Sequence, residues 1–280
     1  MTEQQLCMKP VLIVCRAESA QQAPKWLYAS VSGYRGMVSQ YGVDANPAHH
    51  ICLGGKWLGL CDLFRQQPKL LDEHEYFWFP DDDIQTTPED IQRFFRLCQL
   101  RGFELAQPAL TPNSVYAYRL TVGNPWFEYR LTNFVELMMP LMHKKLLIQL
   151  LPIMADKHAA LGVDWLWHQL VSKPREQVAI IDSVKMGHYR PRNTHLVSRM
   201  RAHEIDLLEE RKQTFKELGI KPYQHAAHAG RLLNGIKVKG LCAKLNVVMG
   251  YFTIRKKITQ QRWKYKHYRA FLSAGKAEGQ

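Results

Sequence analysis

The stretch Tyr76-Phe-Trp-Phe-Pro-Asp81-Asp82-Asp83 decides the fold, because an aromatic run leads directly into three consecutive carboxylates. The aromatic residues predict a buried strand that ends at the proline, which cannot continue a sheet. Side chains alternate between the two faces of a strand. We therefore expect Asp81 and Asp83 on one side, with Asp82 turned away toward sugar, ribose or solvent. The alternative interpretation is a solvated acidic turn that caps the following helix.

Three adjacent carboxylates repel one another, so the cluster is costly unless water, basic side chains or a cation neutralises it. A divalent cation is well suited to this role. Mg²⁺ and Mn²⁺ take oxygen ligands and bridge one or two protein carboxylates to the phosphates of a substrate. The sequence therefore predicts an Mn²⁺ or Mg²⁺ site that includes Asp81 and Asp83.

The segments on either side of this stretch alternate between strand and helix patterns. Residues 11–15 and 178–184 are apolar runs typical of buried strands. Residues 87–98 begin with a capping Thr87 and Pro88, and they predict a helix. Residues 133–151 and 163–171 also have helical patterns, and Pro140 divides the first of them. This alternation predicts an α/β fold with a mixed, mostly parallel sheet flanked by helices.

The motifs Trp57-Leu-Gly-Leu, Phe79-Pro-Asp-Asp-Asp-Ile, Gln107-Pro-Ala-Leu, Asn133-Phe-Val-Glu136, Gly162-Val-Asp164-Trp and His188-Tyr-Arg-Pro occur in this order. Over residues 10–192 the chain resembles an uncharacterised glycosyltransferase-like family with a GT-A fold. The resemblance implies a nucleotide-diphospho-sugar transferase core whose Asp-x-Asp element falls on Asp81 and Asp83. It also implies a second acidic element at Asp164, without its usual preceding Glu, and His188 as a further metal ligand. It names neither donor nor acceptor.

Two carboxylates are candidate catalytic groups. Asp164 follows a glycine and opens a predicted helix, where it is either an N-cap or the general base that accepts a proton from the acceptor hydroxyl. Glu136 precedes an apolar stretch and either orients the acceptor or starts a helix. If Asp164 is the base, we expect an inverting single displacement.

Candidate nucleotide contacts are Arg16 after the first strand, Lys56 after two glycines, Asp82 and Arg190. Arginine suits a diphosphate because its planar guanidinium offers several donors at once. Each of the basic residues has a surface or structural role as its alternative. For His188 the alternative is a hydrogen-bonded structural histidine.

The net charge of +13 is unevenly distributed over the 280 residues. Residues 201–280 carry a net charge of +11, against +2 for residues 1–200. We therefore expect a catalytic domain at 1–200 and a basic, mainly helical extension at 201–280, in which 245–254 is the one candidate strand. The basic and aromatic segment 255–276 is suited to an anionic membrane surface, with nucleic acid and a solvated helix as alternatives.

These features favour a metal-dependent enzyme that moves a sugar from a nucleotide-sugar donor to the hydroxyl of a glycan or glycolipid. A nucleic-acid-binding protein and a metal-dependent nucleotidyltransferase are the alternatives. The first residues show no basic region followed by an apolar stretch, so we expect a cytoplasmic protein that associates with the membrane surface.

Overall fold

The computed structural model describes residues 9–29, 33–42, 46–190 and 206–258. The strands are β1 (Val11–Ala17), β2 (Tyr34–Gln40), β3 (His50–Ile51), β4 (Tyr76–Trp78), β5 (Ile84–Gln85), β6 (Leu105–Leu110), β7 (Phe127–Thr132), β8 (Leu141–His143), β9 (Val178–His188), β10 (Ala227–Leu232) and β11 (Lys237–Lys239). The α-helices are α1 (Lys56–Gln66), α2 (Lys69–Glu73), α3 (Pro88–Arg101), α4 (Lys144–Met154), α6 (Leu207–Glu217) and α7 (Gly240–Thr253). The 3-10 helices are η1 (Ala20–Gln22), η2 (Lys25–Tyr28), η3 (Arg119–Thr121), η4 (Val163–Trp165) and η5 (Trp167–Leu170).

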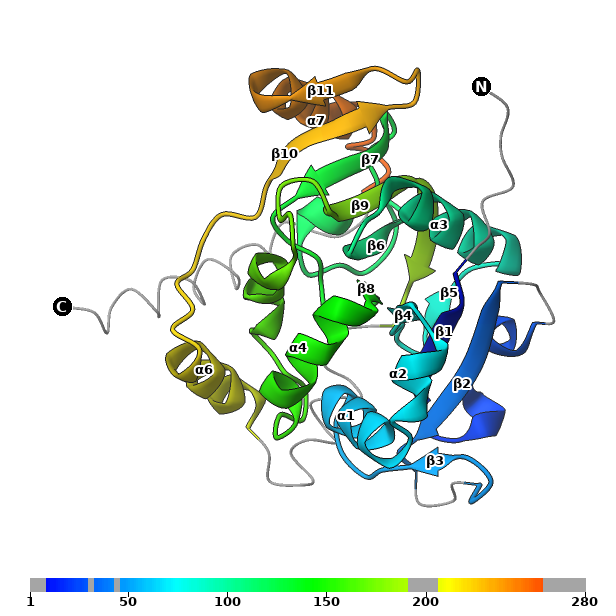
Figure 1. Cartoon of the computed structure of the whole chain (residues 1–280). Helices are drawn as coiled ribbons and strands as arrows, with labels where there is room; N and C mark the ends of the chain where they lie inside the picture. The colour runs from blue at the N-terminus through cyan, green and yellow to red at the C-terminus, as the bar shows by residue number, and fades with distance from the viewer. Residues whose placement is uncertain (1–8, 30–32, 43–45, 191–205, 259–280) are drawn as a thin grey trace.

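A single sheet in the order β11-β10-β7-β9-β6-β8-β4-β1-β2-β3 runs through the molecule, and β5 pairs with the end of β9 (Figure 1). The pairings orient β1, β2, β3, β4, β6, β9 and β10 in one direction, whereas β7, β8 and β11 run against them. The predicted α/β fold with a mixed, mostly parallel sheet is therefore confirmed. This arrangement is consistent with a GT-A-like fold.

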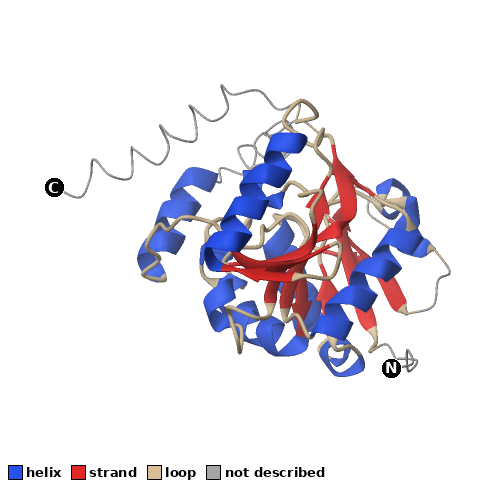
Figure 2. Cartoon of the chain, turned by 90° about the horizontal axis from the view of Figure 1, so that it is seen from above, coloured by secondary structure: helices blue, strands red, loops and turns tan. Residues whose placement is uncertain are grey.

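Strand β1 lies at the centre of two hydrophobic layers because every one of its side chains is buried. Val11, Ile13 and Cys15 pack on the face that α3 covers. Leu12 and Val14 pack on the opposite face, against α1 and α4. Figure 2 shows helices on both sides of the sheet. Burial on both faces explains why 11–15 is continuously apolar rather than alternating.

Helix α3 begins and ends as the sequence predicts. The Thr87 hydroxyl accepts from the backbone N–H of Asp90 at 3.2 Å, and Pro88 occupies the first turn. Gly102 ends the helix with φ of 67°, a left-handed conformation that suits glycine. Its apolar side packs Ile91, Phe94 and Phe95 against the sheet.

The long helix predicted over 133–151 is wrong in its first half. Residues 133–140 form no helix, and residues 141–143 form strand β8, which pairs with both β4 and β6. Only α4 is helical, and it continues past Pro152. Residues 163–170 likewise form two short 3-10 helices in place of one predicted helix. Tertiary pairing outweighs local helical periodicity in these segments.

The segment after residue 200 contributes two strands that the sequence analysis missed. β10 pairs antiparallel with β7, and β11 pairs with β10, so the sheet continues into this segment. The candidate strand 245–254 is wrong, because residues 240–253 form helix α7. The domain boundary near residue 200 stays a prediction based on charge. Within the described ranges, no helix has both the length and the apolar character needed to span a bilayer.

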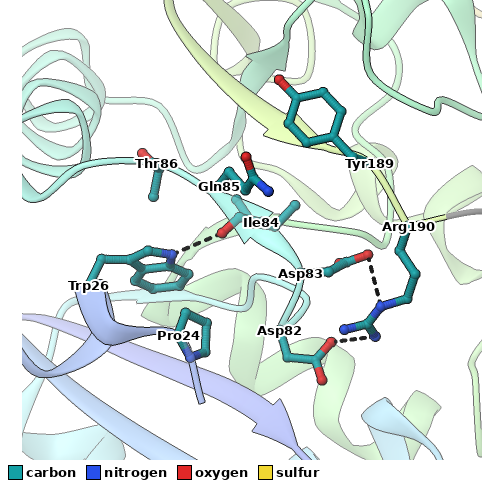
Figure 3. A pocket seen from close by; sticks show the side chains of 9 residues that line it. All are labelled: Pro24, Trp26, Asp82, Asp83, Ile84, Gln85, Thr86, Tyr189 and Arg190. Atoms are coloured by element: carbon teal, nitrogen blue, oxygen red, sulfur yellow. Dashed lines mark hydrogen bonds and ion pairs between the residues drawn. The ribbon is translucent and has the colours of Figure 1, made fainter. Parts of the chain in front are cut away.

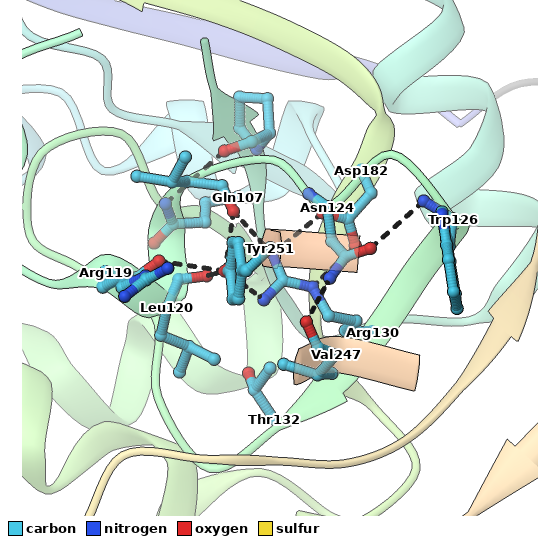
Figure 4. Close-up of polar contacts among 12 residues, drawn as sticks. Gln107, Arg119, Leu120, Asn124, Trp126, Arg130, Thr132, Asp182, Val247 and Tyr251 are labelled. Atoms are coloured by element: carbon cyan, nitrogen blue, oxygen red, sulfur yellow. Dashed lines mark hydrogen bonds and ion pairs between the residues drawn. The ribbon is translucent and has the colours of Figure 1, made fainter. Parts of the chain in front are cut away.

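A buried ion pair attaches α7 to the sheet (Figure 4). Arg130 on β7 donates from Nε and Nη2 to the two carboxylate oxygens of Asp182 on β9, both at 2.8 Å, and both side chains are fully buried. Arg130 Nη1 donates to the Tyr251 hydroxyl at 2.8 Å. The side-chain nitrogen Nδ2 of Asn124 donates to the Val247 carbonyl oxygen at 3.0 Å. Burial opposes the charge on Arg130, but the neighbouring Asp182 carboxylate outweighs it and raises the pKa of the guanidinium.

We predict that Asp182→Asn destabilises the protein by about 3–5 kcal/mol, because it leaves the buried guanidinium without its counter-charge. Urea unfolding followed by circular dichroism measures this change. Glu209→Gln, in the exposed pair with Lys212, is the matched control and should leave the unfolding midpoint unchanged. Equal midpoints for the two variants would contradict a central role for the Arg130–Asp182 pair.

Candidate functional site

The three aspartates lie where the carboxyl ends of β1, β4 and β9 meet. β4 ends at Trp78, and Asp81 then forms an isolated parallel bridge with Arg16 at the end of β1. After the turn at Asp82 and Asp83, β5 pairs with β9 so that Ile84 lies opposite His188. Carboxyl ends of parallel strands are the usual ligand-binding edge of an α/β sheet.

Asp81 is neutralised by Lys56, the first residue of α1. Lys56 Nζ donates to Asp81 Oδ1 at 2.7 Å and to the Phe79 carbonyl at 2.8 Å. It also lies 3.0 Å and 2.9 Å from the carbonyl oxygens of Leu137 and Met138. The ammonium group thus joins α1, the acidic turn and the segment before β8. Its predicted nucleotide role remains a prediction, but its observed contacts are within the protein.

The glycine before Lys56 allows α1 to start here. A Cβ on Gly55 would lie 2.0 Å from the carbonyl oxygen of His158, so a larger residue would push α1 away from the 158–160 segment. This close approach positions Lys56 over Asp81. Gly55 is therefore required here for the packing of α1 against residues 158–160.

Asp82 and Asp83 have different basic partners. Asp82 Oδ1 accepts from Arg190 Nη1 at 2.9 Å, and Asp82 Oδ2 accepts from the Tyr41 hydroxyl at 3.3 Å. Asp83 Oδ2 lies 3.1 Å from His188 Nε2 and 3.6 Å from Arg190 Nε. Figure 3 shows Arg190 reaching over both carboxylates.

The Asp83–His188 pair favours the charged form of both groups. Burial acts to raise the pKa of Asp83, but the hydrogen bond and charge of His188, with the charge of Arg190, lower it overall. Burial acts to lower the pKa of His188, yet the hydrogen bond and charge of Asp83 raise it to about 9. His188 Nδ1 also donates to the Val115 carbonyl at 2.7 Å, which fixes the ring so that Nε2 faces Asp83.

The expected pairing of Asp81 with Asp83 by strand alternation is wrong. Because β4 stops at Trp78, the aspartates follow a bridge and a turn, and their carboxylates point to different partners. Among the described residues, no group of three or more His, Cys, Asp or Glu side chains is arranged to hold a metal ion. Metal binding at this cluster remains a prediction.

Arg16 lies beside the acidic turn, but its guanidinium points into the protein. Nη1 donates to Ser39 Oγ at 2.8 Å, and Nη2 donates to the carbonyl oxygens of Cys52 and Gly54 at 2.9 and 3.0 Å. Only 4% of the residue is exposed. These contacts fasten the loop before α1 to the end of β1, and the nucleotide contact predicted for Arg16 stays a prediction.

A cavity of about 400 Å³ opens beside Asp82 and Asp83. Its other lining residues are Pro24, Trp26, Ile84, Gln85, Thr86, Tyr189 and Arg190 (Figure 3). The Trp26 indole N–H donates to the Ile84 carbonyl at 2.9 Å, which holds the ring at the cavity wall. The sequence did not predict Trp26 and Tyr189 as lining residues of this cavity. The position of Trp26 shortly after the first strand was the available signal.

Glu136 and Asp164 form a second acidic pair, which does not line this cavity. The Glu136 amide donates to Gln107 Oε1 at 2.6 Å, and both carboxylate residues are buried. Burial, and secondarily the charge of Glu136, raises the pKa of Asp164 to about 8. Glu136 is linked to the acidic turn by the backbone, because the carbonyl oxygen of Met138, two residues further along, accepts from both Lys56 Nζ and the backbone N–H of Asp81.

No protein-family model and no curated protein sequence matches the chain. Solved structures with a similar chain path include residues 1–349 of S. aureus TarS in complex with UDP-GlcNAc, at 12% identity and a TM-score of 0.42. That match covers 68% of this chain and 61% of the other. A structure of the same TarS fragment alone has 12% identity and a TM-score of 0.45, over 75% of this chain and 72% of the other.

The structure of A197 from STIV is also similar, at 11% identity and a TM-score of 0.35, over 65% of this chain and 86% of the other. In the match to the TarS fragment in complex with UDP-GlcNAc, this chain spans less than two thirds of the fragment's length. Similarities at this level of identity and TM-score do not show the function of this chain.

We predict that Asp164→Asn stabilises the protein at pH 8 by a few kcal/mol, in order of magnitude. The folded pKa of about 8 lies above the ordinary value of 3.8, so folding takes up a proton between these values. The contribution of Asp164 to the free energy of unfolding therefore falls as pH rises from about 4 to about 8, and it stays constant above that pH. Urea unfolding across this pH range should show a flatter profile for Asp164→Asn.

The control variant is Asp72→Asn, which replaces a carboxylate whose side chain is 83% exposed. It should keep the pH profile of the unmodified protein. A profile for Asp164→Asn that parallels that of the unmodified protein would show that Asp164 titrates normally.

Proposed function

We propose that this protein is a glycosyltransferase that moves a sugar from a nucleotide-sugar donor to a hydroxyl group of a glycan or glycolipid. One observation carries the proposal. A cavity at the carboxyl edge of the sheet combines two carboxylates, an accessible arginine and aromatic side chains. Carboxylates bind sugar hydroxyls or a cation, arginine binds a diphosphate, and aromatic faces pack against a sugar or base. A nucleotide-sugar carries all of these groups.

Arg190 is the proposed diphosphate ligand. Its side chain is 41% exposed, so it can exchange its ion pairs with Asp82 and Asp83 for phosphate oxygens without a change in the backbone. The two aspartates then become available to the sugar or to a cation. This exchange explains why a site for a negatively charged donor contains several carboxylates.

Asp83 and His188 fit a divalent ion better than Asp81 does. The bond from His188 Nδ1 to the Val115 carbonyl leaves Nε2 directed at Asp83, an arrangement common in metal-binding histidines. Because the pKa of His188 is raised to about 9, an ion that binds here has to displace the proton that Nε2 shares with Asp83. Asp81 instead faces Lys56. We propose that Asp83 and His188 hold Mn²⁺ or Mg²⁺ together with donor phosphates. A bound ion supplies charge neutralisation for the departing diphosphate.

Asp164 stays the proposed general base, with Glu136 as its partner, although neither residue lines the cavity in which the donor is proposed to bind. Only the ionised carboxylate can act as a base, and with a pKa of about 8 Asp164 is ionised in only a fraction of the molecules near neutral pH. Transfer is therefore proposed to speed up as pH rises toward 8, and with Asp164 as the base of a single displacement it is proposed to be inverting. Burial is the main cause of the raised pKa of Asp164, and the charge of Glu136 raises it further.

We predict that at least one member of a panel of UDP-, GDP-, CMP- and dTDP-sugars raises the melting temperature of the full chain. Arg190→Gln should weaken binding about tenfold or more, because a charged hydrogen bond to phosphate contributes about 1.5–3 kcal/mol. Asp83→Asn should remove the part of the stabilisation that depends on Mn²⁺. Binding is measured by thermal shift and by calorimetry, with and without Mn²⁺.

The matched controls are Arg93→Gln and Asp90→Asn, an ion pair on α3 that does not line the cavity. They should bind the donor as the unmodified protein does. The proposal fails if no donor stabilises the chain, or if Arg190→Gln and Asp83→Asn bind it unchanged. If the protein were a nucleotidyltransferase, nucleoside triphosphates would raise its melting temperature instead. Product analysis would then detect released pyrophosphate.

A further inference from the structure

Helix α7 is apolar on two opposite faces, and only one of them packs against the protein. The inner face buries Ala243, Gly250 and Tyr251 against the sheet. A Cβ on Gly250 would lie 2.1 Å from Asn124 Oδ1, so this contact is close. The outer face presents Leu241, Leu245, Val248, Met249 and Phe252, which are 71%, 56%, 64%, 49% and 56% exposed.

The five outer residues repeat at the three- and four-residue spacing of one helical stripe, and we call them the α7 stripe. Helix α7 and the β10–β11 hairpin form one edge of the molecule (Figure 1). The hairpin tip adds Leu233 and Ile236, which are also more than half exposed. A contiguous exposed apolar stripe of this kind marks an interaction surface, so we expect an apolar cover over the α7 stripe.

The charge around the α7 stripe indicates what that cover is. Between Glu217 and Glu278 the sequence contains no acidic residue. The described residues 227–258 carry the basic side chains Arg231, Lys237, Lys239, Lys244, Arg255, Lys256 and Lys257. Arg231 is paired with Glu128, so the other six provide the positive charge. Aliphatic residues beside unopposed lysines complement a surface with an apolar interior and anionic headgroups.

We infer that the α7 stripe and its neighbouring lysines dock the protein on an anionic lipid bilayer, with α7 lying in the plane of the headgroups. A second copy of the chain is a poorer cover, because two like-charged surfaces would then face each other. Nucleic acid is poorer too, because single-stranded bases stack on aromatic rings and the α7 stripe contains only Phe252. This surface shares Arg255, Lys256 and Lys257 with segment 255–276, and the rest of that segment from residue 259 lies outside the described residues.

Vesicle co-sedimentation of the full chain tests this inference. We compare phosphatidylcholine vesicles with vesicles that also contain phosphatidylglycerol. The test variant combines Leu241→Ser, Leu245→Ser and Val248→Ser on the α7 stripe. The matched control combines Leu100→Ser, Ile148→Ser and Leu208→Ser, which are 54%, 48% and 55% exposed on other helices. Circular dichroism and the melting temperature confirm that both variants fold.

We expect the protein to prefer the anionic vesicles and the test variant to lose about tenfold or more of its partition coefficient, whereas the control stays unchanged. A second variant combines Lys237→Gln, Lys239→Gln and Lys244→Gln. Its partition coefficient on anionic vesicles should fall about fivefold for each lysine removed. It should also show a weaker dependence on salt. The variant Lys69→Gln with Lys173→Gln, at exposed positions elsewhere, is its control.

Three outcomes would overturn the inference. Unchanged vesicle binding by both α7 variants would assign any binding to another part of the chain. Light scattering that shows a dimer in the unmodified protein and a monomer in the Leu241, Leu245 and Val248 variant would assign the α7 stripe to self-association. Oligonucleotide binding that depends on the same residues, with no vesicle binding, would assign the surface to nucleic acid.

Discussion

Three consecutive carboxylates have to be neutralised in a small volume, and the structure around the candidate site follows from this constraint. Lys56 comes from the start of α1, His188 from the end of β9, and Arg190 from the residues just beyond it. Lys56 pairs with Asp81, His188 pairs with Asp83, and Arg190 pairs with both Asp82 and Asp83. The cluster therefore holds together segments that are more than a hundred residues apart in the sequence, and the cavity lies against the part that Arg190 covers.

The same kind of side chain has opposite proton affinities in two parts of the molecule. Asp83 is buried beside His188 and Arg190, so its pKa falls and it stays ionised. Asp164 is buried beside Glu136, so its pKa rises and it holds its proton near neutral pH. The local neighbours decide the direction of the shift, since burial acts to raise both values. Separate environments of this kind allow one protein to place a charge in one region and a transferable proton in another.

Local patterns in the sequence predicted several elements correctly. The apolar runs of β1 and β9, the aromatic strand before the aspartates, and the capped helix α3 all rely on neighbouring residues. The partners of the aspartates could not be predicted, because Lys56 and His188 approach them only after the sheet has formed. Strand alternation failed at Asp81–Asp83 because the strand ended before the proline. Strand β10 was missed because Ala227–Leu232 contains glycine and charged residues and forms only by pairing with β7.

The attachment of α7 has a consequence for how the chain can be divided. Tyr251 contributes its hydroxyl to the buried Arg130, and Asn124 holds the backbone of the same helix at Val247. A shortened protein that ends before Tyr251 would lack the hydroxyl that accepts from Arg130 Nη1, and this nitrogen of a buried guanidinium would lose that partner. We therefore expect the minimal folding unit to include Tyr251, whereas the domain boundary near residue 200 stays a prediction. Evolutionary exchange of this C-terminal segment between proteins would have to carry along a matching Arg130 and Asp182.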